Sequence, residues 1–287
     1  MRLLSVLAAL LVSVSFSLSL QAETFTFTAI PDQDESRLQQ RFGKVAAYLE
    51  KELGIEVKYV PVKSYAAAVT AFRNNQVQLA WFGGLSGVKA RELVEGSEAI
   101  AQGYEDPNFT SYLIAHKDTG LSNNGSFPSG IEGKTFTFGS KGSTSGRLMP
   151  EYFIRLNLSQ PPSTAFDRVG YSGDHSRTIA LVESGAYEVG AVNYKVWDKG
   201  IANGKIDTDK VQVIWTTPGY PDYQWTIRGD VDARFGEGFK AKVQATLLAI
   251  EDRDILDAFP RKSFIKARNS DYQPIKDTAV SIGLIDG

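Results

Sequence analysis

Apolar and polar positions near the start of the chain follow a strand-then-helix order. Phe and Thr alternate over residues 24–30, TFTFTAI, which is typical of a β-strand. Apolar residues then recur at helical spacing, at Leu38, Phe42, Val45 and Leu49, and Gly54 predicts the end of that helix. Predicted strands at 55–62 and 77–84 are each followed by a further helical pattern. This alternation predicts an α/β fold with mostly parallel strands.

The same order of elements begins again at residue 134. Residues 134–140, KTFTFGS, nearly repeat the first predicted strand and lead into a turn and a helix. Two more predicted strands, at 166–171 and 186–192, are each followed by a helical pattern. The repetition predicts two similar lobes.

Two extended, aromatic-rich segments, 109–118 and 213–230, separate these blocks. Neither has the composition of a flexible linker, and the second is followed by helical patterns without a further run of strands. We therefore predict one lobe from 23–111 plus 226–287 and an inserted lobe from 112–225. Two chain crossings between lobes predict a hinge that closes over a ligand in the cleft.

The N-terminus has the pattern of a secretory signal peptide. Arg2 precedes an apolar stretch from Leu3 to Leu20, and Ala22 is the small residue expected at a cleavage site. The alternative is a membrane anchor, because the stretch is just long enough to span a bilayer. The serines in the stretch and the cleavage site favour removal of residues 1–22. We expect a periplasmic monomer.

Composition removes several classes of function. The 287 residues include 31 basic and 33 acidic side chains, a net charge of −2, with no basic stripe for nucleic acid. The absence of cysteine excludes disulfides, thiolate metal sites and a cysteine nucleophile, and two histidines give little support for a zinc enzyme. We expect no metal, no cofactor and no nucleic-acid partner.

The strongest candidate for ligand chemistry is the turn 142–146, Gly-Ser-Thr-Ser-Gly, at the start of a predicted helix. Unpaired amides at a helix N-terminus attract anions, and hydroxyls donate hydrogen bonds without adding charge. The alternative is an ordinary N-cap, which needs only one hydroxyl, so Ser143, Thr144 and Ser145 in succession favour an anion site. Pro150 predicts a late start or a kink in this helix.

Other strand-to-helix junctions carry further candidates. His175 follows Asp174 at one predicted helix start and Tyr65 follows Ser64 at another, although a structural role is the alternative for both. The remaining candidate ligand residues are Trp81, which is more often a core residue at such a place, Asn193, and Asp222 on the second crossing.

The order of these motifs resembles a known family. Lys63-Ser64-Tyr65, AWFGG at 80–84, GSTSGRLMPEYF at 142–153 and the segment 171–198 are similar to the substrate-binding proteins of phosphate, phosphite and phosphonate ABC importers. Within that family the branch described as selenate transporters is the most similar. The resemblance covers nearly the whole mature chain. It implies a two-lobed, type II periplasmic binding fold, an ABC permease in the inner membrane as partner, and an oxyanion held by Tyr65, Ser143, Thr144, Ser145 and His175.

Two positions depart from the phosphonate binders of that family, which carry an acid at the place of Asn193 and a tyrosine at the place of Phe109. A carboxylate accepts the proton of a phosphonate-type ligand and repels a bare dianion. Asn193 therefore favours a sulfate-like or selenate-like anion, unless Asp222 supplies the missing acceptor.

Three functions are compatible with these residues. The first is a binding protein that captures a small tetrahedral oxyanion for an importer, and the second is a ligand sensor with a separate signalling partner. The third is a secreted hydrolase, but adjacent Asp174 and His175 cannot easily form a catalytic relay, and no GxSxG elbow is present. We therefore expect no catalytic residues and no enzyme activity.

Overall fold

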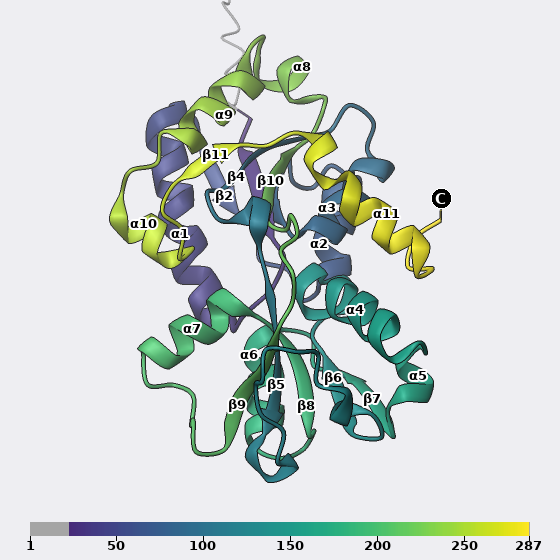
Figure 1. The fold of residues 1–287 in the computed structure, drawn as a ribbon. Coiled ribbons are helices and arrows are strands. Elements are labelled where there is room, and N and C mark those ends of the chain that lie inside the picture. The colour runs from purple at the N-terminus through teal and green to yellow at the C-terminus, as the bar shows by residue number, and fades with distance from the viewer. Residues whose placement is uncertain (1–22, 287) are drawn as a thin grey trace, which may run out of the picture.

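The computed structural model describes residues 23–286, which form two lobes, each built on its own β-sheet (Figure 1). The predicted signal peptide, residues 1–22, lies outside the described residues. Lobe 1, at the top of Figure 1, contains a six-stranded sheet of order β11-β4-β10-β3-β1-β2. Lobe 2, below it, contains a five-stranded sheet of order β7-β6-β8-β5-β9. The α/β, two-lobed prediction is confirmed.

Lobe 1 takes its elements from both ends of the chain. Its strands are β1 (Phe25–Ala29), β2 (Val57–Tyr59), β3 (Leu79–Phe82), β4 (Glu98–Gly103), β10 (Gln224–Ile227) and β11 (Phe264–Lys266). Its α-helices are α1 (Glu35–Leu53), α2 (Tyr65–Arg73), α3 (Gly84–Leu93), α8 (Val231–Phe235), α9 (Phe239–Leu248), α10 (Arg253–Ala258) and α11 (Gln273–Ser281). A short 3₁₀ helix, η1 (Asp106–Asn108), leads out of this lobe.

Lobe 2 is formed by the middle of the chain. Its strands are β5 (Ser111–His116), β6 (Thr135–Phe138), β7 (Arg168–Tyr171), β8 (Val189–Asn193) and β9 (Val211–Thr216). Its α-helices are α4 (Met149–Leu158), α5 (Pro162–Ala165), α6 (His175–Glu183) and α7 (Tyr194–Ala202), and a π-helical turn, η4 (Thr144–Leu148), precedes α4. Short 3₁₀ turns complete the loops: η2 (Lys117–Thr119) and η3 (Ser129–Ile131) here, and η5 (Asn269–Tyr272) in lobe 1.

The predicted repeat occupies the centre of the parallel part of each sheet. β1 pairs in parallel with β2 and β3, and β6 pairs in parallel with β7 and β8. The Phe side chains of both strands, Phe25, Phe27, Phe136 and Phe138, are fully buried. The alternation of Phe and Thr therefore marks the same structural position in both lobes.

The prediction of mostly parallel strands is wrong for the strands next to the crossings. β10 runs antiparallel to β3 and β4, and β11 runs antiparallel to β4. In lobe 2, β5 runs antiparallel to β8 and β9. A segment that arrives from the other lobe enters its sheet in the reverse direction, so both sheets are mixed.

Two chain segments cross between the lobes and pair with each other. The Phe109 N–H donates to the Tyr220 carbonyl at 2.8 Å, and the Tyr220 N–H donates to the Phe109 carbonyl at 2.9 Å. β10 begins at Gln224, before the boundary predicted after residue 225, because Gln224 and Trp225 already pair with β3. The paired crossings form the hinge of the fold.

Apolar packing holds each lobe separately. In lobe 1 the Trp81 ring lies 5.3 Å from the Trp225 ring and 5.1 Å from the Phe259 ring, measured between centroids. In lobe 2 the neighbouring β5 residues Leu113 and Ile114 belong to different apolar clusters, so helices cover both faces of the sheet. Between residues 23 and 286, no helix has the length and apolar character needed to cross a membrane.

Candidate functional site

Four helix N-termini meet where the two lobes face each other. In lobe 1, α2 begins after β2 and α3 begins after β3. In lobe 2, η4 begins after β6 and α6 begins after β7. Two hydrogen bonds join the lobes here: the Leu85 N–H donates to Thr144 Oγ1 at 3.0 Å, and the His175 N–H donates to the Asp32 carbonyl at 3.0 Å. The structure therefore has the lobes closed on each other around these residues.

The hydroxyls of the 142–146 turn are buried and have three different roles. Ser143 Oγ accepts the Gly146 N–H at 2.9 Å, which is the N-cap alternative considered for this turn. Thr144 Oγ1 accepts the Leu85 N–H of lobe 1. Ser145 Oγ is buried and has no hydrogen-bond partner among the described residues. One hydroxyl therefore caps the helix, one joins the lobes, and the third lies near the Asp222 carboxyl without a hydrogen bond to it.

Pro150 shapes the start of the helix that follows this turn. The Leu148 N–H donates to the Ser143 carbonyl five residues back at 3.0 Å, so the first turn, η4, is a π-helix. The regular helix α4 begins only at Met149, which places Pro150 in its first turn, where its missing N–H costs little. The predicted late helix start is confirmed.

Asp222, on the second crossing, places a buried carboxyl at the same site. Its side chain is 1% exposed, and Oδ1 accepts the Gly84 N–H at 2.9 Å. Oδ2 is buried and has no partner among the described residues. Burial raises the pKa of Asp222 to about 7, although the Gly84 N–H and the Thr144 and Ser145 hydroxyls act to lower it. This carboxyl can therefore hold or release a proton near neutral pH.

His175 is a neutral hydrogen-bond donor at the entrance of α6. Its side chain is fully buried, and Nδ1 accepts the Asn193 N–H at 3.3 Å. That hydrogen bond assigns the proton of the neutral ring to Nε2, which is buried and has no partner among residues 23–286. Burial lowers the pKa of His175 to about 4, against a smaller opposite effect of Asp32. The ring is therefore uncharged at pH 7 and presents an N–H.

Tyr65 closes the other side of the site. Ser64 caps α2 by accepting the Ala67 N–H at 3.0 Å, so Tyr65 begins the helix and its side chain is only 2% exposed. Burial raises the pKa of Tyr65 well above 10, so the phenol keeps its proton, and Ser143 lies close enough to act on it. A Cβ on Gly142 would lie 3.2 Å from the Tyr65 Cβ, which explains the glycine at that position.

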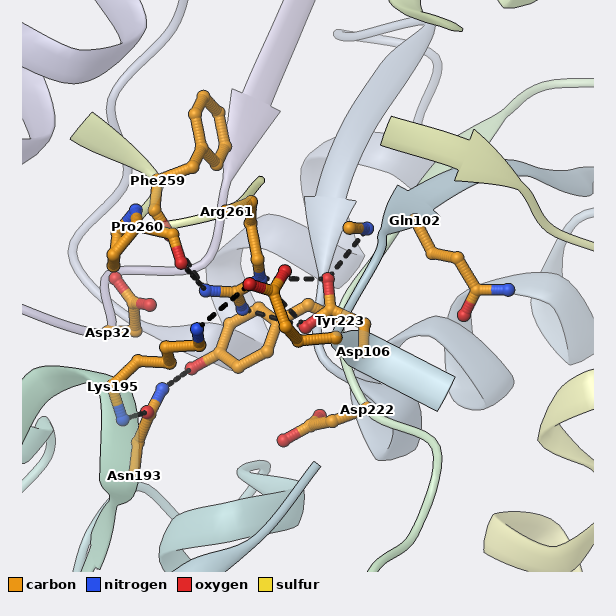
Figure 2. A network of polar contacts seen from close by, with 12 residues as sticks. Asp32, Gln102, Asp106, Asn193, Lys195, Asp222, Tyr223, Phe259, Pro260 and Arg261 are labelled. Carbon is orange, nitrogen blue, oxygen red and sulfur yellow. Dashed lines mark hydrogen bonds and ion pairs between the residues drawn. The ribbon is translucent and has the colours of Figure 1, made fainter. Parts of the chain in front are cut away.

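Two predicted ligand residues are engaged with protein groups. The Asn193 oxygen accepts the N–H groups of Lys195 and Val196 at 2.7 and 3.3 Å and so caps α7, while its nitrogen donates to the Tyr223 hydroxyl at 2.8 Å (Figure 2). Trp81 stacks on Tyr223 with ring centroids 5.5 Å apart. The Asn193 oxygen is therefore used by α7 and one of its two amide hydrogens by Tyr223, so one N–H remains for the anion contact expected from the sequence. Trp81 belongs to the core of lobe 1, and both Trp81 and Asn193 contact Tyr223.

Some site groups were not identified from the sequence. The Gly84 and Leu85 amides face Asp222 and Thr144, and the signal in the sequence is the glycine pair at 83–84. A Cβ on Gly83 would lie 3.0 Å from Asp222 Oδ1 and 3.2 Å from Thr144 Oγ1. A larger residue at position 83 would therefore crowd the Asp222 carboxyl and the Thr144 hydroxyl.

The arrangement is suited to binding a small anion that carries a proton. Three buried atoms without partners among the described residues combine two donors, Ser145 Oγ and His175 Nε2, with one acceptor, Asp222 Oδ2. An open hollow of about 940 Å³ lies next to this site. It is lined by residues of both lobes, including Tyr65, Gly142, Lys89 and Lys141. Within residues 23–286, no group of three or more His, Cys, Asp or Glu side chains could hold a metal ion.

Comparisons with known proteins agree with this geometry. A family model described as "ABC transporter, phosphonate, periplasmic substrate-binding protein" matches residues 27–272. The probable ABC transporter phosphite-binding protein PhnD1 of Prochlorococcus marinus (strain MIT 9301) is 41% identical over 256 residues, covering 87% of this chain and 86% of that protein. The phosphonates-binding periplasmic protein of Escherichia coli (strain K12) is 27% identical over 197 residues, covering 67% of this chain and 57% of that protein.

Solved structures give the same result. The structure of the P. marinus protein in complex with methylphosphonate matches with a TM-score of 0.87, covering 91% of this chain and 99% of that chain at 41% identity. A binding protein of an ABC phosphonate transporter from Pseudomonas aeruginosa matches with a TM-score of 0.79 at 20% identity, covering 90% of this chain and 86% of that chain. The second match supports the fold.

Proposed function

Because the chain belongs to the family of phosphonate-binding periplasmic substrate-binding proteins of ABC transporters, we propose that it captures a small phosphorus oxyanion, such as phosphite or methylphosphonate. The chain is a substrate-binding component and not an enzyme. The proposed direct contacts are Tyr65, Ser145 and His175, with Asp222 as the acceptor of the ligand's proton. Ser143 and Thr144 shape the site, because their oxygens already accept the Gly146 and Leu85 N–H groups.

The observation that carries this proposal is that three of the six buried side-chain atoms without partners in the described chain, Ser145 Oγ, His175 Nε2 and Asp222 Oδ2, belong to residues of this site. A buried polar atom without a hydrogen bond costs about 1–3 kcal/mol, so the closed site is incomplete until something satisfies all three. Two donors and one acceptor complement an anion with deprotonated oxygens and a single P–OH group.

Proton affinities support a phosphorus ligand. Phosphate-type groups have a second pKa of about 6, close to the value of about 7 to which burial raises the pKa of Asp222. Ligand and carboxyl can therefore share one proton in a strong, charge-assisted hydrogen bond. Sulfate and selenate oxygens hold a proton weakly and require Asp222 to be protonated. Asp222 thus supplies the acceptor that Asn193 lacks. We therefore expect the site to prefer an anion that carries a proton over the bare dianion that Asn193 alone favours.

The test is a calorimetric titration of phosphite, methylphosphonate, phosphate, sulfate and selenate at about pH 5, 6.5 and 8.5, on the wild type and on Asp222→Asn. Above the pKa of Asp222 the complex must take up one proton, so the wild-type Kd should rise by about tenfold per pH unit. Phosphorus ligands should also bind more weakly below about pH 6, where binding releases a proton, whereas sulfate and selenate should not.

Asp222→Asn should lose most of its affinity for phosphite and methylphosphonate. Its Kd for sulfate and selenate should not rise at high pH, unlike that of the wild type. The opposite order in the wild type, with selenate bound more tightly than either phosphorus ligand and equally well at about pH 6.5 and 8.5, would show that Asp222 is not the acceptor.

We further propose that the leader is cleaved after Ala22 and that the exported protein acts as a monomer that delivers its ligand to the permease of its ABC transporter. The family assignment supports export to the periplasm. The intact mass of the exported protein, together with its mass in solution under native conditions, decides both points, and a mass that includes residues 1–22 contradicts the first.

A further inference from the structure

We infer that the buried ion pair between Asp106 and Arg261 is a positioning pair that holds Asp222 and both hinge crossings in place for the ligand. This inference rests on the proposed role of Asp222. Asp106 and Arg261 lie 155 positions apart in the chain, and neither is among the proposed ligand contacts. The argument begins at the backbone of Asp222.

The backbone of Asp222 is fixed by Asp106. The Asp222 N–H donates to the Asp106 carbonyl at 3.0 Å. Close by, the two crossings pair through Phe109 and Tyr220 in both directions. The position of the Asp222 carboxyl therefore depends on where η1, which begins at Asp106, is held.

Arg261 fixes Asp106 in turn. The guanidinium Nη2 lies 2.7 Å from Oδ1 of Asp106, and Nε donates to the same carboxylate at 3.0 and 3.1 Å (Figure 2). The Gly103 N–H donates to Asp106 Oδ2 at 2.7 Å. The side chains of Arg261 and Asp106 are only 4% and 0% exposed. A planar guanidinium that binds a carboxylate through two nitrogens fixes orientation as well as distance.

The local backbone is adapted to this pair. A Cβ on Gly103 would lie 2.5 Å from Arg261 Cδ and 2.6 Å from Asp106 Oδ2, so only glycine fits there. Arg261 Nη1 also donates to the Phe259 carbonyl at 2.7 Å, which anchors the guanidinium to the segment after α10. The pair is thus held from three separate segments of lobe 1.

Arg261 also contacts both crossings through their aromatic rings. Its guanidinium carbon lies 5.3 Å from the centroid of Phe109 on the first crossing and 5.3 Å from that of Tyr223 on the second. Tyr223 directly follows Asp222 and accepts the Asn193 amide of lobe 2 at 2.8 Å. Buried ion pairs contribute little to net stability because of their desolvation cost. A role in positioning accounts for this pair better than a role in stability.

The test measures two properties of Arg261→Met, Arg261→Lys and Asp106→Asn: the Kd for methylphosphonate, and the titration of the Asp222 carboxyl in ligand-free protein by ¹³C NMR. We expect the Kd to rise by about tenfold to a hundredfold, as when the supporting partners of metal ligands are removed. Arg261→Lys should recover only part of the affinity, because lysine keeps the charge but not the planar guanidinium.

The direction of the Asp222 titration separates positioning from general loosening of the fold. The Asp106 charge acts to raise the pKa of Asp222, and Asp222 in turn raises the pKa of the phenols that face it, those of Tyr65, Tyr220, Tyr223 and Tyr272. Arg261→Met leaves the Asp106 charge uncompensated, so the midpoint should rise. Asp106→Asn leaves the Arg261 charge uncompensated, so the midpoint should fall. Loosening alone would move both variants in the same direction.

Two controls keep the result interpretable. Arg228→Lys changes an arginine of lobe 1 that also bonds an aspartate, backbone carbonyls and an aromatic ring, Phe72, but lies away from the hinge. The double variant Asp106→Asn, Arg261→Met leaves no unpaired buried charge, so it should fold if a single variant does not. We expect it to have a raised Kd with a nearly unchanged Asp222 midpoint.

The inference is overturned if the Asp106 and Arg261 variants keep the wild-type Kd and Asp222 midpoint, or change them no more than Arg228→Lys does. If the wild type itself binds neither methylphosphonate nor phosphite, the proposed function fails. In that case the ligand-free titration still shows whether the pair acts on the Asp222 carboxyl.

Discussion

At the scale of single residues, the site assigns different tasks to side chains of the same kind. Ser143 caps the π-helical turn, Thr144 accepts a hydrogen bond across the lobes, and Ser145 has no partner among the described residues. The sequence alone does not distinguish the three hydroxyls at 143–145. Their difference arises because the turn places one hydroxyl toward its own backbone, one toward lobe 1 and one toward the enclosed site.

Alanine substitutions should separate these tasks. Ser145→Ala should cost about 1.5–3 kcal/mol of binding to methylphosphonate, because it removes a hydrogen bond to a charged ligand, and should leave Tm unchanged. Ser143→Ala should instead lower the free energy of unfolding by about 1 kcal/mol through loss of the cap. Calorimetry and thermal unfolding of both variants measure this. Equal losses of affinity with no loss of stability would contradict the assignment.

Two buried titratable groups should oppose each other in the pH dependence of stability. Burial lowers the pKa of His175 to about 4, so the unfolded chain binds more protons, and this contribution to stability is lost as the pH falls from about 6.5 to 4. Burial raises the pKa of Asp222 to about 7, so the folded chain binds more protons, and this contribution is lost as the pH rises from about 4 to 7.

The two slopes largely cancel in the wild type and should appear in single variants. His175→Gln should lose stability as the pH rises from about 4 to 7, and Asp222→Asn should lose stability as the pH falls below about 6.5, each by about 1 kcal/mol per pH unit. Urea unfolding of ligand-free protein at several pH values measures both slopes. Parallel curves for the two variants would show that neither group is buried as described.

At the scale of elements, the sequence predicts well wherever a pattern is local. The Phe and Thr alternation identifies β1 and β6, and Gly54, with φ of 72°, ends α1 where expected. The 142–146 turn and the Asp174 cap of α6 are also local signals. The role of Asn193 was not predictable, because it depends on Tyr223 from the second crossing. The pair of Asp106 and Arg261 could not be predicted from the sequence, because its residues lie 155 positions apart and only the fold brings them together.

The junction between β3 and α3 yields a prediction for this scale. Gly83→Ala should weaken methylphosphonate binding, because the added Cβ would lie 3.0 Å from Asp222 Oδ1 and 3.2 Å from Thr144 Oγ1. The backbone at Gly83 has φ of −80°, which alanine adopts freely, so Tm should hold. Gly43→Ala is the matched control, because nothing lies within 4 Å of its Cβ, and it should bind normally and be stabilised by up to about 1 kcal/mol.

At the scale of the whole molecule, affinity depends on how readily the lobes close, because the site is assembled from both lobes and the hinge. Besides the contacts near the ligand, an ion pair joins the lobes: Lys195 Nζ at the start of α7 lies 3.2 Å from Glu105 Oε1, just before η1. Their side chains are 18% and 16% exposed, so water screens this pair less than a surface pair. Because the pair joins the two lobes, we expect it to favour the closed arrangement.

Lys195→Met should consequently weaken binding without altering any ligand contact. A partly buried pair that contributes about 1 kcal/mol to closure would raise the Kd by about fivefold when lost, and would leave the dependence of binding on pH unchanged. Small-angle scattering should show that the variant still contracts on saturation with methylphosphonate but requires more ligand to do so. Lys210→Met, which removes an ion pair with Asp207 inside lobe 2, is the control and should bind as the wild type does. A Kd for Lys195→Met equal to that of the control would mean that closure is driven by the ligand and the hinge alone.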